Sequence, residues 1–201
     1  MGLVLAAILV LLAFEGIDAH GKLVNPMNRG TLGGYLYDNQ NFCGGYWIQH
    51  VNGGKCGVCG DNYKDQVPRA QENGGRYGRG KIVQTYKSGE NISVTVDLSA
   101  NHDGYFQFAV CPLDDQAETE ECFEAHPLLL AKDGSDKYYV GKKSGRLDID
   151  LTLPKNLKCQ QCSLRWHYHT ANMWGMCENG RGQMGCGPQE NYRTCSDVAI
   201  V

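Results

Sequence analysis

The sequence has few features of a membrane protein or of a nucleic-acid-binding protein. Its longest apolar run is GLVLAAILVLLAF at residues 2–14, which is too short to cross a bilayer, and no later run is long enough. The sequence ends at Val201 without an apolar tail for a lipid anchor. Its 19 Lys and Arg residues are scattered and nearly balanced by 22 Asp and Glu residues. We therefore expect no membrane span and no nucleic-acid partner, but a neutral polymer or a small molecule as ligand.

The apolar run at the start of the chain has the form of a secretory leader. It is followed by Glu15 and by the small residue Ala19, after which signal peptidase can cut. We expect residues 1–19 to be a signal peptide and the protein to be soluble, secreted and extracellular. The remainder contains no internal repeat and no low-complexity linker. Residues 20–201 therefore predict one domain that is long enough for a hydrophobic core and begins with His20.

The cysteines indicate a disulfide framework. All ten follow the leader, at Cys43, Cys56, Cys59, Cys111, Cys122, Cys159, Cys162, Cys177, Cys186 and Cys195. The two C-x-x-C pairs, 56–59 and 159–162, could in principle form a four-cysteine zinc site. They lie too far apart for a zinc ribbon, and a secreted protein matures in an oxidising compartment. We therefore predict disulfides, whose pairing the spacing leaves open.

Long helical periods are absent, and the chain instead divides into a glycine-rich first third and a strand-rich remainder. Between residues 30 and 80 the density of glycine favours turns over regular helix. After residue 81, apolar and polar residues alternate with period two, which is typical of half-buried strands. The predicted strands are residues 91–99, 105–110, 146–153, 163–170 and 195–201, and only residues 115–126 suggest a short helix. This pattern predicts an all-β fold, an antiparallel β-sandwich with long loops held by disulfides.

Two histidines lie on the same face of one predicted strand. His167 and His169 are two residues apart, so both point away from the face that carries Trp166 and Tyr168. Such a pair could share a metal ion. Because no third ligand is obvious nearby, we instead expect a solvated or hydrogen-bonded pair opposite an aromatic core face.

His20 and His102 suggest a different metal site. A histidine at the first position of a chain can chelate one metal through both its α-amine and its imidazole, with pKa values of about 8 and about 6.5. One further imidazole would complete a set of three nitrogens, which is a coordination that copper favours. His102 follows the first predicted strand directly, in the turn segment SANHDG. It could supply that imidazole or be a polar turn residue.

Several segments together resemble one known family. The expected cut before His20–Gly21, the segment SANH at residues 99–102 and CGPQENYRTCSDVAI at residues 186–200 are similar to the lytic polysaccharide monooxygenases, specifically the animal-type auxiliary activity family fifteen. The similarity extends over essentially the whole expected mature chain and includes CGVCGD at residues 56–61. It implies a β-sandwich of immunoglobulin or fibronectin type III topology.

The resemblance also implies a set of catalytic residues around one copper ion. His20 would bind copper through its amine and ring nitrogen, and His102 would bind through its ring, forming a histidine brace. Tyr192 would occupy a weak axial position, and Ala100 would crowd the opposite axial side without being a ligand. Gln189 and Glu190 are close enough in sequence to Tyr192 to be candidates for assisting oxygen activation.

The activity implied by the resemblance is oxidation of a polysaccharide rather than its hydrolysis. An external electron donor and O2 or H2O2 would support hydroxylation at C1 or C4 of the glycosidic linkage. The expected substrate is chitin, with cellulose as the alternative. The tyrosines Tyr35, Tyr37 and Tyr46 could stack on sugar rings, and Asn91 begins a glycosylation sequon. We expect a monomer. The alternatives are a chitin- or carbohydrate-binding matrix protein that ignores copper, and a copper-binding protein that uses the same brace without acting on sugars.

Overall fold

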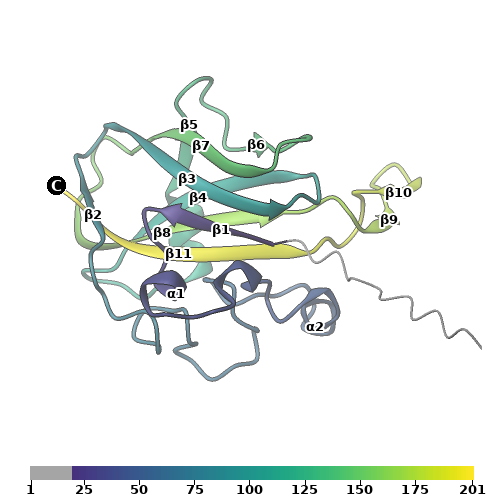
Figure 1. The fold of residues 1–201 in the computed structure, drawn as a ribbon, viewed down its shortest axis with the longest axis horizontal. Coiled ribbons are helices and arrows are strands. Elements are labelled where there is room, and N and C mark those ends of the chain that lie inside the picture. The colour runs from purple at the N-terminus through teal and green to yellow at the C-terminus, as the bar shows by residue number, and fades with distance from the viewer. Residues whose placement is uncertain (1–19) are drawn as a thin grey trace, which may run out of the picture.

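The computed structural model describes residues 20–201, so the expected leader lies outside the described residues. Nine strands form one curled sheet in the order β1-β3-β7-β5-β4-β8-β11-β2, with β6 (Tyr138–Tyr139) beside β4. In chain order the eight strands of the main path are β1 (His20–Asn25), β2 (Gln84–Tyr86), β3 (Asn91–Ala100), β4 (Tyr105–Pro112), β5 (Pro127–Leu130), β7 (Gly145–Thr152), β8 (Cys159–His169) and β11 (Asn191–Ile200). A separate hairpin consists of β9 (Trp174–Met176) and β10 (Gly182–Met184). The sheet curls so that β1, β3 and β7 form one layer, and β4, β8 and β11 form the other (Figure 1).

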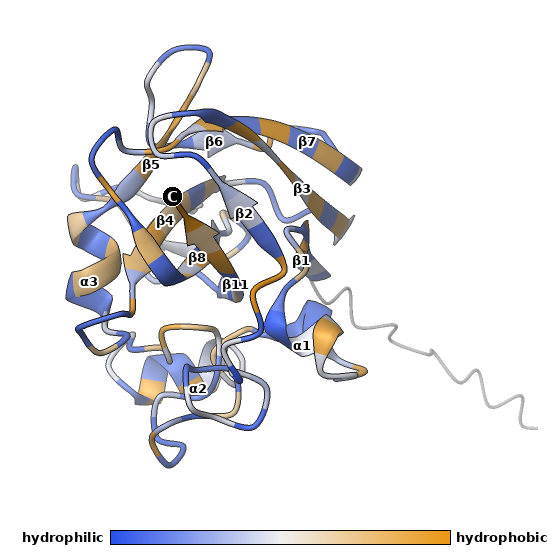
Figure 2. Cartoon of the chain, turned by 90° about the vertical axis from the view of Figure 1, so that its left-hand side faces the viewer, coloured by the Kyte–Doolittle hydropathy of each residue, from blue (hydrophilic) through white to orange (hydrophobic). Residues whose placement is uncertain are grey.

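The core lies between these two layers, as the alternation in the sequence predicts. On β3, the side chains of Ile92, Val94, Val96 and Leu98 are buried while their neighbours face outward. The facing layer contributes large aromatic side chains such as Phe106 and Trp166. Figure 2, which looks along the strands, separates the two layers and shows hydrophobic residues alternating with polar ones along β3 and β7. Each of the five predicted strands is confirmed, although β8 and β11 begin several residues earlier than expected.

One pair of strands departs from the antiparallel prediction. β2 runs parallel to β11, with Val198 opposite Gln84 and Ile200 opposite Tyr86. A parallel pair requires a long connection between its strands. Here that connection includes the strands β3 to β8, so the sequence between β2 and β11 gives no local sign of the pairing.

The prediction of a single helix is also incomplete. α3 (Glu120–Ala125) falls within the predicted segment and is capped by Thr119, whose side chain accepts a hydrogen bond from Cys122 N. The glycine-rich third contains two further helices, α1 (Arg29–Leu32) and α2 (Tyr46–Val51), and a 3-10 turn, η1 (Asp38–Gln40). The side chain of Asn28 caps α1 by accepting from Thr31 N, which offsets the low helix propensity of its sequence RGTL. Within residues 20–201 no helix is long and apolar enough to span a membrane.

All ten cysteines form disulfides, which confirms the expected framework. The pairs are Cys43–Cys56, Cys59–Cys195, Cys111–Cys122, Cys159–Cys162 and Cys177–Cys186. Cys59–Cys195 joins the loop-rich third to β11, and a buried ion pair of Arg29 with Asp197 at 2.6 Å holds the same two parts together. The glycine-rich third is therefore fixed against the sandwich although its own hydrophobic core is small.

Candidate metal centre

His20 and His102 are brought to the same edge of the sandwich by the pairing of β1 with β3. In this antiparallel pair His20 lies opposite Ala100, and His102 follows two residues later. Ser99 also donates a hydrogen bond from Oγ to the carbonyl oxygen of His20 at 3.0 Å. Figure 1 shows the start of β1, the end of β3 and the start of β11 at one end of the molecule.

The residue after His20 is a glycine that packs closely against the core. A Cβ atom on Gly21 would lie 3.0 Å from the indole of Trp166 and 3.3 Å from the side chain of Leu98. A larger residue would require these two side chains to shift by a few tenths of an ångström in a closely packed core. The side chain of His20 therefore lies at the edge of the sandwich, and Gly21 next to it lets β1 pack closely against the core.

The turn that carries His102 is held on both sides. The amide N–H of His102 donates to the hydroxyl of Tyr168 at 2.8 Å, and the carbonyl of His102 accepts from Ala171 N at 2.9 Å. The turn ends at Gly104, which has a φ of +83° and no room for a Cβ because that atom would lie 2.0 Å from the carbonyl oxygen of His169. The position of His102 is therefore set by contacts with β8 and the segment that follows it.

Each of the two imidazoles has one ring nitrogen engaged by a neighbouring side chain. Nε2 of His20 lies 2.6 Å from the amide of Gln40, at the end of η1. Nδ1 of His102 lies 2.6 Å from the amide of Asn172 and 3.7 Å from a carboxylate oxygen of Glu190. Nδ1 of His20 is the nitrogen that could close a chelate ring with the α-amine of the same residue. For His102, Nε2 is the nitrogen that a metal would take.

Tyr192, the second residue of β11, is buried. It is 1% exposed, stacks on Phe42 with ring centroids 5.9 Å apart, and lies 6.0 Å from the ring of Tyr168. Two residues further along β11, Oγ1 of Thr194 accepts a hydrogen bond from Leu23 N of β1 at 3.1 Å. This contact joins β11 to β1.

The donors at this edge suit copper better than harder cations. They are two imidazoles and, after cleavage before His20, one amine, and nitrogen donors of this kind favour Cu²⁺ over Mg²⁺ or Ca²⁺. A second cluster of metal-ligating residues, Cys59, Glu118 and Cys195, does not form a metal site. Both of its sulfur atoms are joined in a disulfide, and its carboxylate pairs with Arg29 at 3.0 Å.

His167 and His169 pack together but are not a promising metal site: the ring of His167 is hydrogen-bonded, whereas the buried Nε2 of His169 has no hydrogen-bond partner among the described residues. Their rings are 3.7 Å apart, and Nε2 of His167 lies 2.9 Å from Asn191 Oδ1 and 3.2 Å from Arg193 Nε. Burial, together with nearby Arg193 and Arg165, lowers the pKa of both histidines, that of His169 to about 4. The same positive charges would repel a cation.

The three tyrosines expected to bind sugar differ in exposure. Tyr37 is 60% exposed and directly precedes η1. Tyr35 is half-buried against the ring of Tyr77 at 5.3 Å, and Tyr46 is half-buried with Trp47 packed edge-on against it at 5.2 Å. Only Tyr37 has the open ring that stacking on a sugar requires.

Two exposed tryptophans at the same end of the molecule were not among the sugar-binding residues predicted from the sequence. Trp47 on α2 is 74% exposed, and Trp174 on β9 is 63% exposed. Figure 1 places α2 and the β9–β10 hairpin at the end where β1 begins. Each tryptophan lies in a polar or glycine-rich segment close to disulfide-bonded cysteines, and that context could have marked them as exposed side chains.

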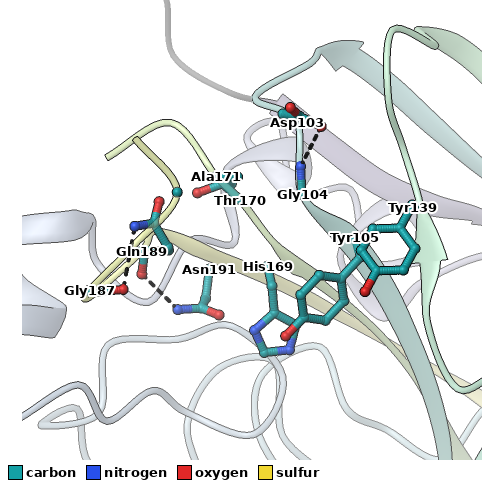
Figure 3. Close-up of a pocket in the computed structure, with 11 residues that line it drawn as sticks. Asp103, Gly104, Tyr105, Tyr139, His169, Thr170, Ala171, Gly187, Gln189 and Asn191 are labelled. Carbon is teal, nitrogen blue, oxygen red and sulfur yellow. Dashed lines mark hydrogen bonds between the residues drawn. The ribbon is translucent and has the colours of Figure 1, made fainter. Parts of the chain in front are cut away.

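Gln189 and Glu190 have different roles although they are adjacent. Gln189 ties down the β9–β10 hairpin by accepting from Met173 N at 3.0 Å and donating to the carbonyl of Cys186 at 2.8 Å. Glu190 reaches His102. Gln189 also lines a cavity of about 550 Å³ behind the turn of His102, where Tyr105, Tyr139 and Asp103 form the opposite wall (Figure 3).

The glycosylation sequon lies far from this edge. Asn91 is exposed at the first residue of β3, whereas Ala100 is the last. The side chain of Asn91 accepts a hydrogen bond from Thr152 Oγ1 at 2.8 Å.

Comparison with known proteins identifies the family. Residues 20–198 match the family described as "Lytic polysaccharide mono-oxygenase, cellulose-degrading". The AA15 lytic polysaccharide monooxygenase of Thermobia domestica in its Cu(I) state is 40% identical, with a TM-score of 0.85 over 90% of this chain and 98% of that chain. No curated protein sequence matches the chain.

More distant structures share the fold alone. An AA10 lytic polysaccharide monooxygenase of Streptomyces lividans is 16% identical with a TM-score of 0.53, over 90% of this chain and 99% of that chain. A chitin binding domain of Burkholderia pseudomallei is 10% identical with a TM-score of 0.52, over 92% of this chain and all of that chain. The family match and the Thermobia structure together show that the chain belongs to the AA15 lytic polysaccharide monooxygenases, which are copper-dependent enzymes that cleave polysaccharides oxidatively.

Proposed function

We propose that the secreted protein begins at His20 and binds one copper ion at the edge where β1 and β3 end. The amine and Nδ1 of His20 and Nε2 of His102 would hold the metal, with Tyr192 as a weak further ligand and Ala100 beside the site without being a ligand. The observation that carries this proposal is the register of β1 with β3, which sets His20 opposite Ala100 and two residues from His102. The family match begins at the same residue, His20.

When bound, copper would supply the redox chemistry by which a carbon of the glycosidic bond is hydroxylated, either by O2 with two electrons from an external donor or by H2O2 once the donor has reduced the metal, the second oxygen atom leaving as water. The protein's own residues would position the polymer and the ligands. Tyr37, Trp47 and Trp174 present exposed rings around the site, on which sugar rings can stack. The disulfides Cys43–Cys56 and Cys177–Cys186 hold the segments that carry the tryptophans, which suits binding to a rigid polymer.

Glu190 is the acidic group best placed to handle a proton near the metal. Its carboxylate lies 3.7 Å from the ring of His102 and is about 14% exposed. A carboxylate at this position can accept or return a proton while the polymer covers the site. Gln189 is committed to the hairpin and would not take that role.

We propose chitin as the preferred substrate and C1 as the carbon oxidised, with cellulose, which the family's description names, as the second substrate to test. We propose a monomer that acts outside the cell. Purified protein with His20 at its N-terminus, loaded with copper and given ascorbate, is expected to release aldonic-acid oligosaccharides from chitin.

Mass spectrometry of the soluble products tests this proposal. Products oxidised at C4, or products from cellulose alone, would correct the regiochemistry or the substrate. Binding to chitin with copper bound but no oxidised product would support a matrix protein. Tight copper binding with neither product nor polymer binding would support a copper-binding protein.

A further inference from the structure

Two side-chain amides contact the two imidazoles of the proposed copper site, one amide to each ring. Gln40 at the end of η1 lies 2.6 Å from Nε2 of His20. Asn172, between β8 and β9, lies 2.6 Å from Nδ1 of His102. In each case the nitrogen contacted is the one that the proposed copper site does not use.

Metal binding fixes where the proton of each ring must be. A neutral imidazole has one N–H and one lone pair, so a nitrogen that binds metal places the proton on the other nitrogen. For His20, a chelate through Nδ1 and the α-amine leaves the N–H on Nε2. For His102, binding through Nε2 leaves the N–H on Nδ1. Each amide must therefore offer its carbonyl oxygen to the ring, which requires both amides to be turned over from the orientation in which Nε2 of Gln40 and Nδ2 of Asn172 face the rings.

The contacts of Thr170 determine which end of the Asn172 amide faces His102. Oγ1 of Thr170 lies 3.0 Å from the carbonyl oxygen of Glu190 and 2.8 Å from Oδ1 of Asn172, whose Nδ2 faces His102. A hydroxyl has a single proton to donate, and a backbone carbonyl can only accept. If that proton goes to Glu190, the amide must donate its NH2 to Thr170.

Turning the amide over in this way exchanges Oδ1 and Nδ2, so that the carbonyl oxygen of Asn172 faces Nδ1 of His102. The two ends of a side-chain amide have nearly the same shape, so the surrounding hydrogen bonds decide between them. The reverse orientation would leave the Thr170 and Glu190 oxygens facing each other without a proton. It would also place the N–H of His102 on Nε2, where it would block the metal. Thr170 is 3% exposed, so water does not readily replace these contacts.

The backbone around both amides is held independently of their side chains. Lys22 pairs with Asp38 of η1 at 2.7 Å, and Gln40 N donates to the carbonyl of Tyr37 at 2.9 Å. Beside Asn172, Ala171 N donates to the carbonyl of His102. Removing either amide should therefore leave the local fold in place and change mainly the histidine that it contacts.

We infer that Gln40 and Asn172 are positioning residues that hold His20 and His102 in the tautomers needed to bind copper. The inference rests on the proposed function, because it presupposes a metal between the two rings. Each amide accepts the outer N–H of its imidazole and thereby also restrains the rotation of the ring. Residues that hold metal-binding histidines in this way typically contribute about 10–100-fold to metal affinity.

The experiment compares copper affinity among substitutions at the two positions. Gln40→Leu and Asn172→Leu keep the approximate size of the side chain and remove the acceptor. Each is expected to weaken Cu²⁺ binding by about 10–100-fold in competition with a chelator and to change the Cu²⁺ electron paramagnetic resonance spectrum. Gln183→Leu, at an exposed amide on β10, is the matched control and should change neither quantity.

A second pair of variants separates the acceptor from the shape of the side chain. Gln40→Glu and Asn172→Asp retain an oxygen acceptor and are expected to keep copper affinity within about threefold of the unsubstituted protein, since carboxylates also serve as partners of metal-binding histidines. Loss of affinity in the acidic variants as large as in the leucine variants would overturn the inference, as would leucine variants that bind like the unsubstituted protein. If the unsubstituted protein itself fails to bind copper tightly, the proposed function fails instead.

Discussion

At the scale of single residues, substitution of His102 tests which pair of histidines binds copper. The two pairs are His20 with His102 and His167 with His169. His102→Ala removes one of the three proposed nitrogen donors, so we expect copper affinity to fall by at least about 100-fold. His167→Ala is the matched control and should leave copper affinity unchanged, because His167 is engaged with Asn191 and lies beside Arg193. Isothermal titration calorimetry with Cu²⁺ measures both. Retained affinity in His102→Ala would redirect the metal to the pair of His167 and His169.

Asp61 is a residue whose charge affects stability rather than activity. Burial raises its pKa to about 7 from an ordinary value of 3.8, against the effect of the hydrogen bond from Gln71 N. The folded state therefore holds a proton that the unfolded state releases at lower pH, so stability should fall as pH rises from about 4 to about 7. Asp61→Asn cannot ionise and avoids this loss.

We expect Asp61→Asn to be more stable than the unsubstituted protein by about 1–4 kcal/mol at pH 8, with a much smaller difference at pH 4. Urea unfolding at both pH values measures the difference. Asp65→Asn, at an exposed acid of the same loop, serves as control and should show no such dependence on pH. A constant advantage of Asp61→Asn across this range would assign the effect to something other than ionisation.

At the scale of elements, α2 and the β9–β10 hairpin present the exposed tryptophans of the proposed polymer face. The indole of Trp174 lies over Gly182 across the hairpin, where a Cβ would come within 2.2 Å of the ring. Trp47→Ala and Trp174→Ala should each weaken binding to chitin by about 1 kcal/mol, roughly fivefold, and leave copper affinity unchanged. Sedimentation binding to insoluble chitin provides the measurement. Leu129→Ala, at an exposed apolar residue on β5, is the control, and an equal loss there would remove the assignment of this face.

The elements also show what the sequence can and cannot predict. The alternation of Ile92, Val94, Val96 and Leu98 predicted β3 because burial on one face imposes period two. The pairing of His20 with Ala100 could not be predicted by the same argument, because it joins strands distant in sequence. Their functional association came instead from similarity to a family. α1 was missed because its stability depends on the Asn28 cap and on burial of Arg29 rather than on helix propensity.

Gln40 and Asn172 mark the limit of prediction at the site itself. Each lies in a segment without a regular pattern, and its role depends on a contact with a strand or turn that lies far away in the sequence. The disulfide pairing was equally inaccessible, since Cys56 and Cys59 are neighbours in sequence but pair with Cys43 and Cys195. Such disulfide and hydrogen-bond partners become known only from the folded arrangement of the chain.

At the scale of the whole molecule, the proposed chemistry is confined to one end of the sandwich. β3 runs ten residues from Asn91 to Ala100, which corresponds to about 30 Å at the rise of an extended strand. A glycan on Asn91 would therefore project from the far end and leave the polymer face clear. Asn91→Gln is expected to release oxidised products at the unchanged rate, even where the unsubstituted protein carries a glycan. A change in rate of more than about twofold, at equal copper loading, would contradict this separation.

Cleavage before His20 is expected to complete the metal site, because it frees the α-amine of that residue. With His20 inside a longer chain, its backbone nitrogen belongs to a peptide bond and offers no amine, so the residue can give only one ring nitrogen to a metal. Protein that retains a single methionine before His20 should keep the fold and the melting temperature of the metal-free protein, yet bind copper at least about 100-fold more weakly and release no oxidised sugar. Mass spectrometry of the intact protein establishes the N-terminus, and titration with Cu²⁺ measures the affinity. Equal copper affinity in both forms would show that the metal is held without the amine of His20, because the added methionine changes little else at this edge.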